Sequence, residues 1–345
     1  APVETPHGNI PSTNVEVNGE MLQTLSRVYW MTGEEKYLDW AIRLGDYYLL
    51  GDHHPTRDFD QLRLRDHGCE IVSGLCELYA AVSFARPEKK QQYQESIRAM
   101  CDRILEIGRN EHGMLYNTIN PKTGAHSDGI CDTWGYNYNG YYTVYLIDDV
   151  EQYRQAVLKV LGNLDEHYRN YPWEGRSSDG YADSIESGLN LFNREPVPSV
   201  ADWLDSQIKI MWSNQQPSGI VEGWHGDGNS DRTAIMYAFW KTQGTTAHPW
   251  RKDLRYGAQP QGDAICISLL AAEKDWKGRV QFDTPRHKTQ MHMPLDYPRI
   301  NQFPEWFTVE ADKRYEVRNL LDDSTTTYTG QEMAEGIALE TKAGR

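Results

Sequence analysis

The chain has 345 residues, with 35 Lys and Arg against 50 Asp and Glu, so its formal net charge is −15 at pH 7. A surface this acidic repels phosphate backbones and excludes a nucleic-acid partner. No apolar stretch approaches the roughly 20 residues that cross a bilayer, so no membrane partner is expected either. The 21 tyrosines and 11 tryptophans outnumber the 7 phenylalanines. This excess of hydrogen-bonding aromatics fits walls that stack on sugar rings, with ordinary core packing as the alternative.

The five cysteines are odd in number and none stands in a CxxC pair, so neither a disulfide framework nor a zinc knuckle is indicated. The sequence also lacks HExxH, GxGxxG and P-loop motifs. We therefore predict no metal and no cofactor. The first residues have no signal-peptide pattern but fit what remains after cleavage. A secreted or periplasmic location is favoured and a cytoplasmic one stays open, and the sequence gives no oligomeric state.

Helical periodicity dominates the first ~275 residues. Residues 20–33 and 34–50 both carry apolar side chains at helical spacing and follow one another with almost no gap, which predicts an antiparallel helical hairpin. Residues 69–85 and 87–108 repeat the scheme, with Pro87 in a first-turn position. Further helices are predicted at 139–147, 150–168, 183–192, 199–212, 232–244 and 263–275.

These helices are of two kinds. Residues 69–85, 183–192 and 264–272 are rich in small and apolar side chains and contain no lysine, whereas 87–108 and 150–168 carry charges along one face. A helix that is apolar all round is buried, and a charged amphipathic helix lies outside it. The sequence therefore predicts a mainly α fold, an (α/α)6 toroid of helical hairpins. The interval between the last two predicted inner helices is too short for a full outer helix. The sequence is therefore compatible with an incomplete toroid as well as with a complete one.

The loops that lead into the inner helices are long and rich in Gly, Asp, His, Arg and aromatic residues, and a toroid opens them all at one end. They are residues 7–19, 63–70, 127–140, 177–186, 221–232 and 255–263. We therefore expect their side chains to meet around the mouth of a cavity.

Beyond Lys274 the sequence alternates, contains Pro and Thr, and predicts short strands. These are expected within residues 278–287, 288–297, 305–311, 314–321 and 325–330. The predicted organisation is a catalytic toroid over residues 1–275 and a β-strand-rich region over 276–345 that packs on it.

Acids are numerous in the loops, and glycoside hydrolysis needs two carboxyl groups, one of them held protonated. Glu222 is the first candidate, because it follows apolar residues and precedes Trp224 and His225, a setting that raises a carboxyl pKa. Asp132, beside Trp134, is the second. The further catalytic candidates are Glu186 and Glu70. The alternative for each of these acids is an ordinary helix cap.

Cations at the mouth of a cavity in so acidic a chain point to an anionic ligand group, and arginine recognises carboxylates bidentately. Pairing of each Arg with a neighbouring acid is the equal alternative. The predicted substrate-binding residues are Arg65, His67, Trp134, Tyr136, Asn137, Tyr138, Trp224, His225 and Arg232.

The helix alternation, the loops at 131–140, 179–188 and 221–232, and the tail at 291–310 together resemble the six-hairpin (α/α)6-toroid carbohydrate-active enzymes. These include unsaturated glucuronyl hydrolases, related β-glucuronidases and β-L-arabinofuranosidases, and several polysaccharide lyases. The resemblance covers about residues 14–345 as architecture. It implies an oligo- or polysaccharide substrate and acidic catalytic residues on such loops, with Asp132 as the nearest counterpart.

The function predicted is therefore a β-glucuronidase-like glycoside hydrolase that acts on uronic-acid-containing glycans by carboxylate general acid/base catalysis. A polysaccharide lyase is the first alternative, with Tyr138, His225 or His67 as base and Asn137 as the group that neutralises the carboxylate. A non-catalytic glycan-binding protein would use the same aromatic mouth. A sugar epimerase fits the β-rich tail and the acidic loops less well.

Overall fold

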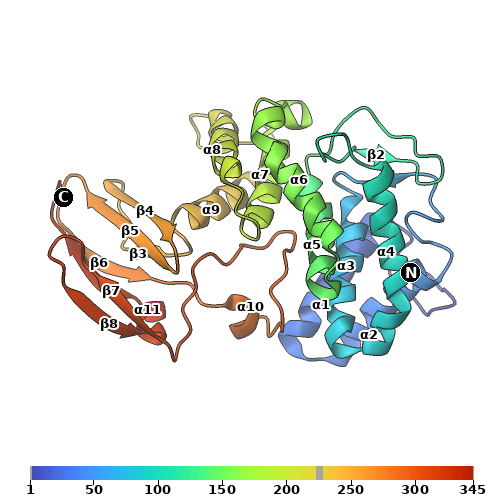
Figure 1. Cartoon of the computed structure of the whole chain (residues 1–345), viewed down its shortest axis with the longest axis horizontal. Helices are drawn as coiled ribbons and strands as arrows, with labels where there is room; N and C mark the ends of the chain where they lie inside the picture. The colour runs from blue at the N-terminus through green and yellow to red at the C-terminus, as the bar shows by residue number, and fades with distance from the viewer. Residues whose placement is uncertain (1, 223–227, 345) are drawn as a thin grey trace. The chain divides into compact units, whose positions relative to one another are not determined.

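The computed structural model describes residues 2–222 and 228–344 (Figure 1). The chain divides into two compact units. Unit 1 comprises Ala1–Thr233 and Met291–Gln302, and unit 2 comprises Ala234–Gln290 and Phe303–Arg345. The division falls between residues 233 and 234 rather than at the predicted boundary after residue 275, and one segment of the tail returns to unit 1.

Unit 1 is built from consecutive helical hairpins, in which each pair of helices is joined by a short turn. Its helices are α1 (Val15–Thr32), α2 (Glu35–Gly45), α3 (Cys69–Ala85), α4 (Pro87–Ile107), α5 (Trp134–Asp148), α6 (Glu151–Tyr168), α7 (Ser178–Phe192) and α8 (Pro198–Ser213). Two short strands, β1 (Leu62–Arg63) and β2 (Thr118–Ile119), pair antiparallel in the loops. Among the described helices, none is long and apolar enough to cross a membrane.

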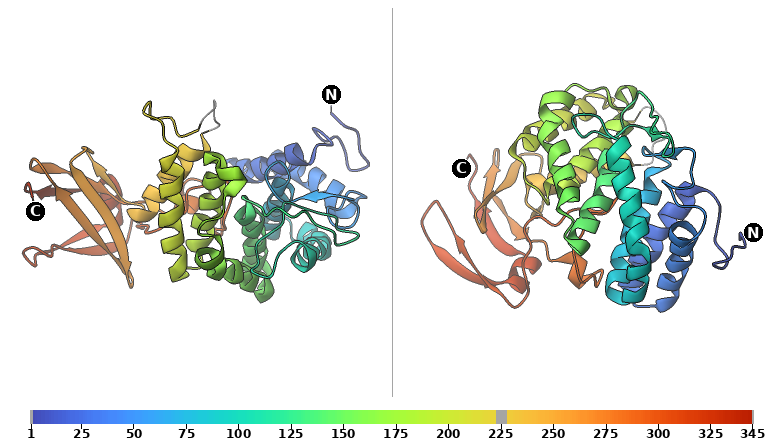
Figure 2. Two further views of the ribbon diagram at one scale, coloured as in Figure 1. Left: turned by 90° about the horizontal axis from the view of Figure 1, so that it is seen from above. Right: turned by 45° about the vertical axis from the view of Figure 1, so that its right-hand side comes forward.

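The odd-numbered helices α1, α3, α5 and α7 pack on one another in chain order, and each also packs on the helix that follows it (Figures 1 and 2). Helix α3 is buried over most of its length, and so are α5 and α7, whereas α4 and α6 bury only one face. The absence of lysine from the inner helices has this physical reason, since a buried ammonium group is costly. The inner helices predicted over residues 69–85 and 183–192 and the outer helices predicted over 87–108 and 150–168 are confirmed, whereas the inner helix predicted over 264–272 is absent.

The inner helices approach so closely that two of their contacts require glycine. A Cβ on Gly19 of α1 would lie 2.4 Å from the carbonyl carbon of Glu70 in α3, and a Cβ on Gly74 of α3 would lie 2.5 Å from the main-chain oxygen of Gly19. The backbones of α1 and α3 are therefore in direct contact near the starts of both helices.

The helix predicted over residues 232–244 is present as α9 (Asn229–Lys241). It starts beside α7, where the Thr233 hydroxyl donates to the main-chain oxygen of Ala182 at 3.2 Å. Among the described residues, four hairpins and the start of a fifth inner helix are present, which is the incomplete form of the predicted toroid. The fold class is confirmed: mainly α, of the six-hairpin kind but incomplete, with a β-rich region in the C-terminal part.

The helix predicted over residues 263–275 is wrong. Residues Ala264–Ala271 form strand β5, which pairs antiparallel with β4 (Leu254–Gln261) in unit 2. Side chains along β5 alternate between exposed and partly buried, which is the period of a strand. Small residues such as Cys266 and Ser268 conceal this alternation in the sequence.

The rest of unit 2 consists of short antiparallel strands and two small helices. Strand β6 (Trp276–Gln281) lies between β3 (Thr246–His248) and β9 (Ile337–Thr341), and β7 (Arg314–Arg318) pairs with β8 (Thr325–Thr329). The strands predicted within residues 278–287, 314–321 and 325–330 are thus confirmed. The strands predicted within 288–297 and 305–311 are absent from the structure, and β9 was not predicted.

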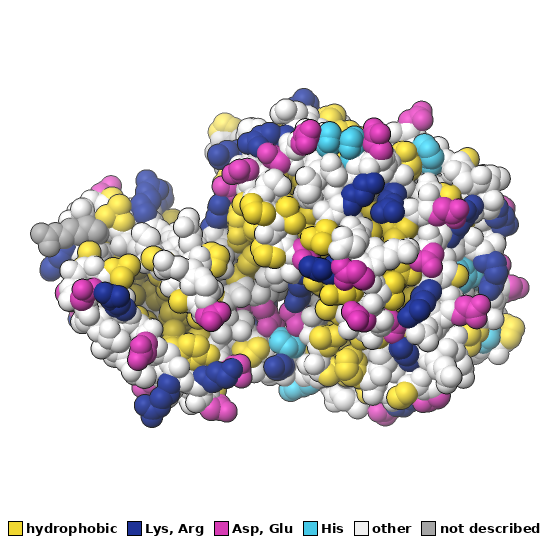
Figure 3. Space-filling model, in the orientation of Figure 1, with side chains coloured by type: hydrophobic (Ala, Val, Ile, Leu, Met, Phe, Trp, Pro, Cys, Tyr) yellow, Lys and Arg dark blue, Asp and Glu magenta, His cyan; other side chains and the backbone are white. Residues whose placement is uncertain are grey.

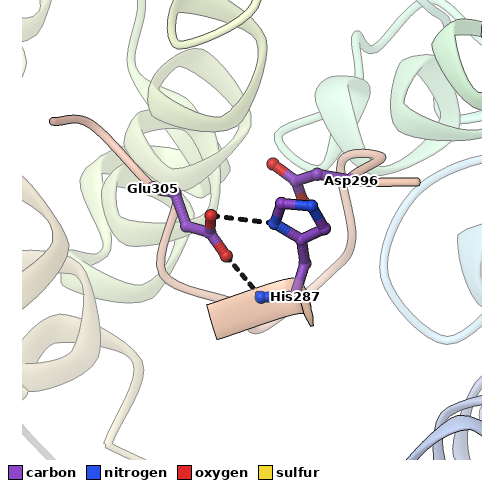
Figure 4. Close-up of side chains that lie close together, drawn as sticks. All are labelled: His287, Asp296 and Glu305. Atoms are coloured by element: carbon purple, nitrogen blue, oxygen red, sulfur yellow. Dashed lines mark hydrogen bonds and ion pairs between the residues drawn. The ribbon is translucent and has the colours of Figure 1, made fainter. Parts of the chain in front are cut away.

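The core of unit 2 is small and is formed mainly by Trp276, Val280, Val309, Met333 and Ile337. Apolar side chains gather on the strands of this unit (yellow in Figure 3). The short helix α10 (Arg286–Thr289) begins at a carboxylate: Glu305 accepts the main-chain N–H of His287 at 2.6 Å and contacts its Nδ1 at 2.9 Å (Figure 4). Helix α11 (Gly330–Glu335) starts with a capping box.

The segment Met291–Gln302 belongs to unit 1 and runs along its inner helices. Met293 packs against Ala80 near the end of α3, and Ile300 packs against Cys69 at the start of the same helix. The segment is therefore antiparallel to α3. It occupies the inner face of the helices, where the sequence predicted the hollow of a toroid.

The contact between α1 and α3 can be tested with a pair of glycine substitutions. Gly74→Ala should destabilise the protein by about 1–3 kcal/mol, because the new methyl group meets main-chain atoms that cannot move aside. Urea unfolding followed by circular dichroism measures the change.

Gly162→Ala in α6 is the matched control, because a Cβ there would meet nothing within 4 Å. This change should be neutral or stabilise by about 0.5–1 kcal/mol through helix propensity alone. Similar effects of the two substitutions would contradict the close packing of α1 on α3.

Candidate active site

The loops that lead into α1, α3, α5, α7 and α9 meet at one edge of unit 1, which we call the rim. Hydrogen bonds of 2.6 to 2.9 Å link them: Glu16 with His67, Arg65 with Glu174, Tyr136 with Asp183, and Arg232 with Glu186. The predicted convergence holds for five of the six loops. The sixth, residues 255–263, belongs to the β4–β5 hairpin of unit 2.

Asp132 lies in the loop before α5 and is only 5 % exposed. One of its oxygens accepts the main-chain N–H of Thr133 at 3.0 Å. Desolvation by burial raises the pKa of Asp132 to about 6, the cation of Arg65 opposes this rise, and the negative charge of Glu174 adds to it. Asp132 therefore exchanges its proton near neutral pH, as a general acid must.

Asp183 is a second buried acid, in the first turns of α7. The Tyr136 hydroxyl donates to it at 2.9 Å, and burial together with the charges of Asp179, Asp132 and Glu186 holds the pKa of Asp183 well above its ordinary value. Several carboxyl groups thus share one desolvated region, where not all of them can be ionised at once. Asp183 was not among the catalytic residues predicted from the sequence.

Glu186 is fully buried and has three hydrogen-bonding contacts. Arg232 holds one of its oxygens through two nitrogens, at 2.8 and 2.7 Å, and the main-chain N–H of Asn301 donates to the other at 2.7 Å. Arg232 also lies 4.0 Å from Asp183. Arg232 was predicted to bind substrate, and Glu186 was a catalytic candidate. The structure places them in an ion pair whose carboxylate is fully buried and whose arginine side chain is one fifth exposed, at 20 %. The partner of Arg232 is thus not the neighbouring acid expected from the sequence.

Glu174 is a rim residue that the sequence analysis missed. Its carboxylate accepts from Arg65 at 2.9 Å and from the Ser177 hydroxyl at 2.8 Å. Glu174, Gly175 and Arg176 all have positive φ, at 43°, 67° and 75°. Such backbone strain in non-glycine residues concentrates at functional sites. The sequence signal is weak, because an acid before a single glycine is common in ordinary loops.

Glu222 was the first catalytic candidate. It is buried, and its carboxylate accepts the main-chain N–H of Ser230 in the first turn of α9 at 3.1 Å, as a capping residue does. It also lines a recess of about 290 Å³ with Arg176 and Asp179. Trp224 and His225, both predicted to bind substrate, lie outside the described residues.

The aromatic side chains around Asp132 do not form the predicted wall. Trp134 and Tyr138 are fully buried, and their polar atoms donate to the Ser184 hydroxyl at 3.1 Å and to the main-chain oxygen of Gly113 at 2.6 Å. They are core residues whose hydrogen-bonding groups are satisfied, which corrects the substrate-binding prediction. Tyr136 is the aromatic residue of this stretch that contacts an acid of the rim.

Asn137 is fully buried and donates to the main-chain oxygen of Leu64 at 2.6 Å, so it holds the loop before α3 against α5. Its predicted contact with substrate is therefore not supported by its position. The His67 ring, with φ of 63° at this residue, contacts Glu16 at 2.6 Å and Asp66 at 3.0 Å, and the hydrogen bond to Glu16 raises the His67 pKa. Burial raises the pKa of Glu70 nearby.

No protein-family model matches the sequence, and no curated protein matches it. Solved structures do resemble the fold. The match to the crystal structure of D-mannose isomerase covers 64% of this chain and 68% of the isomerase chain, with 13% sequence identity and a TM-score of 0.48. A family 76 glycoside hydrolase from a bovine Bacteroides thetaiotaomicron strain matches 60% of this chain and 49% of its own, with 12% identity and a TM-score of 0.43.

An unsaturated glucuronyl hydrolase specific for heparin matches 60% of this chain and 63% of its own, with 12% identity and a TM-score of 0.40. The chain thus spans between about half and two thirds of the length of these proteins. It has a distant structural similarity to six-hairpin carbohydrate-active enzymes, the similarity concerns the fold alone, and no single family is identified.

The raised pKa of Asp132 predicts a pH-dependent cost in stability. Between the ordinary value of 3.8 and about 6, folded Asp132 keeps its proton while the unfolded chain loses it, so the free energy of unfolding falls as pH rises through this window. The full difference is on the order of 3 kcal/mol. Asp132→Asn should therefore gain stability relative to the wild type at pH 7.5 compared with pH 4. Urea unfolding at both values measures this, and an equal difference at both would contradict the shift.

The ion pair of Arg232 with Glu186 predicts a structural role for Arg232. Arg232→Met leaves the fully buried Glu186 without its cation and should destabilise the protein by roughly 3–5 kcal/mol. The control is Arg169→Met, which removes the exposed pair with Asp165 on α6 and should change stability by no more than about 0.5–1 kcal/mol. Urea unfolding measures both changes. Equal losses in the free energy of unfolding in the two variants would contradict a structural role for Arg232.

Proposed function

We propose that this protein is a glycoside hydrolase that acts on uronic-acid-containing glycans. The observation that carries the proposal is Asp132, a buried carboxyl whose pKa is raised to about 6 at a rim where several acids meet. A general acid in glycoside hydrolysis has to be protonated near neutral pH and give its proton to the leaving oxygen. Desolvation prepares Asp132 for this role in the way that it prepares other carboxylic acids in catalysis.

Glycoside hydrolysis needs a second carboxyl group, and we assign it to Glu174. This residue is close enough to Asp132 for its charge to raise the Asp132 pKa, and its side chain is about one third exposed, at 33 %. Arg65 and Ser177 orient the carboxylate. Its place on a strained loop is a further reason for the choice. Glu222, Glu186 and Glu70 remain candidates, each with a main-chain contact, an ion pair or burial that reduces its freedom to act.

The surroundings support a division of roles between the two acids. Asp183 and Glu186 lie on α7 and the partner of Glu186, Arg232, lies on α9, whereas Tyr136 comes from α5. Arg65 comes from the loop before α3, and Glu174 from the loop directly before α7. Asp132 thus has carboxyl groups around it and one cation near it. An uneven field of this kind keeps one carboxyl protonated while another is ionised.

Uronic acids are the substrate class favoured by the partly exposed cationic side chains of the rim, although both of these side chains also contact acids of the protein. Arg65 presents a guanidinium that is about one quarter exposed, at 28 %, and His67 is half exposed at the same edge. A lyase reaction that uses Tyr138 as base is less favoured, because this hydroxyl is buried, donates to Gly113 and has a pKa raised by burial.

Conservative substitutions of the acids test this assignment. Asp132→Asn and Glu174→Gln should each lower kcat by roughly 10²-fold or more, because each removes one of the two carboxyl groups that the reaction needs. The assay is a panel of aryl glycosides and acidic polysaccharides, read by new reducing ends and by the ultraviolet absorbance of unsaturated uronates. The same changes at Glu222, Glu186 and Glu70 rank the remaining candidates, and Glu166→Gln, at an exposed position on α6, is the control.

The pH profile supplies a second reading of the same assignment. If Asp132 is the acid, kcat/KM of the wild type should fall as pH rises through about 6, since the deprotonated carboxyl cannot protonate the leaving group. Unchanged turnover in Asp132→Asn would exclude it. Appearance of unsaturated products without hydrolysis would assign the protein to the lyases.

A further inference from the structure

Residues 61–65 form an extended segment that sorts its side chains onto two faces. Leu62 and Leu64 are buried, at 1 % and 0 % exposure, whereas Gln61, Arg63 and Arg65 point to the opposite face. Alternate residues of a strand share a face and repeat about every 6.5–7 Å. The sequence QLRLR thus presents two guanidinium groups and an amide on one surface.

The second wall comes from β2, which pairs with β1. Arg63 is in register with Thr118, and the main-chain N–H of Leu64 donates to the oxygen of Asn117 at 2.9 Å. This pairing places Asn117 and Thr118 beside the two arginines. The side chains enclose a recess of about 460 Å³, lined by Gln61, Arg63, Arg65, Asn117 and Thr118.

The charges of this recess are only partly compensated. Arg65 gives one nitrogen to Glu174, while its Nε is buried and has no hydrogen-bond partner among the described residues. Arg63 makes no ion pair within the part of the chain that the structure describes. The recess is lined by two arginines and by no acid, so its local charge is positive although the net charge of the chain is −15.

We propose that this recess is a subsite for the anionic group of an acidic sugar, a carboxylate or a sulfate. The inference rests on the proposed function, because Arg65 connects the recess to the acids: one of its nitrogens donates to Glu174, and the same residue lines the recess. A sugar whose anion lies on Arg63 and Arg65 then reaches toward Glu174 and Asp132. Guanidinium groups bind the two oxygens of a carboxylate in parallel, and the amides and hydroxyl complete the set of donors.

The test is binding of three monosaccharides that differ in one group. Glucuronate, glucose 6-sulfate and neutral glucose are titrated into the full chain at low salt, and ligand-observed NMR gives the dissociation constants. The anions should bind at least roughly 10-fold more tightly than glucose, and added salt should weaken them. The two anions tell a carboxylate subsite from a sulfate subsite. Binding that does not distinguish anion from glucose overturns the inference.

The variants locate the binding. Arg63→Gln should weaken the anions roughly 10-fold or more, because it removes one charge-assisted contact, and Asn117→Ala tests the second wall if Arg63→Gln misfolds. Arg169→Gln, directly after the end of the outer helix α6, is the matched control and should bind as the wild type does. Unchanged anion affinity in Arg63→Gln and Asn117→Ala would overturn the subsite.

The outcome is separable from that of the proposed function. Selective anion binding that depends on Arg63, without turnover of any glycoside, would support the subsite and contradict the hydrolase. Turnover of acidic glycosides with no Arg63-dependent anion binding would do the reverse.

Discussion

The direct contact between inner helices is the constraint on which the rest of unit 1 depends. Gly19 and Gly74 bring the backbones of α1 and α3 together, and a Cβ on Gly135 at the start of α5 would lie 2.4 Å from that of Ser187 in α7. Helices that approach this closely leave little space between their starts, so the loops that precede them are forced against one another. The rim is a consequence: it forms where the helices begin, and the acids of several loops become neighbours because the helices below them have no room to separate.

Crowding and burial of acids at the rim destabilise the fold when these acids are ionised. The same effect raises the carboxyl pKa values on which the proposed catalysis depends. Burial favours the neutral form of a carboxyl, so Asp132 and Asp183 retain protons at pH values where exposed aspartates are ionised. Glu186 is held by an ion pair with Arg232 and by a hydrogen bond from the main-chain N–H of Asn301. The segment Met291–Gln302 therefore belongs to the site as well as to the core, because it fills the inner face of the helices and satisfies a buried carboxylate. The open region is left at the rim, where Arg63, Arg65 and Glu174 reach solvent.

Sequence periodicity predicted the hairpins and most of the inner and outer helices. Buried helices such as α3 and α7 contain no lysine, so their composition distinguishes them from the charged outer helices. It failed where two structures share one composition: the small side chains of residues 264–271 suit a buried helix as well as a strand, and only their pairing with β4 decides between them.

The site was predicted in part. Asp132 and the meeting of five loops follow from the hairpin pattern, but the identity of the contacts does not. Trp134 and Tyr138 are polar-edged aromatics that the core satisfies through Ser184 and Gly113, far away in sequence. Glu174 is proposed as the second acid because of its electrostatic effect on Asp132 and its backbone conformation, neither of which is visible in a single sequence.

The central claim is that convergence of the loops desolvates Asp132 and keeps it protonated close to neutral pH. The most direct measurement is titration of its side-chain carboxyl by carbon-13 NMR in protein labelled at aspartate, with Asp132→Asn used to assign the signal. A midpoint at about 6 is the predicted result. A midpoint at the ordinary value near 3.8 would place this carboxyl in contact with water and contradict the account.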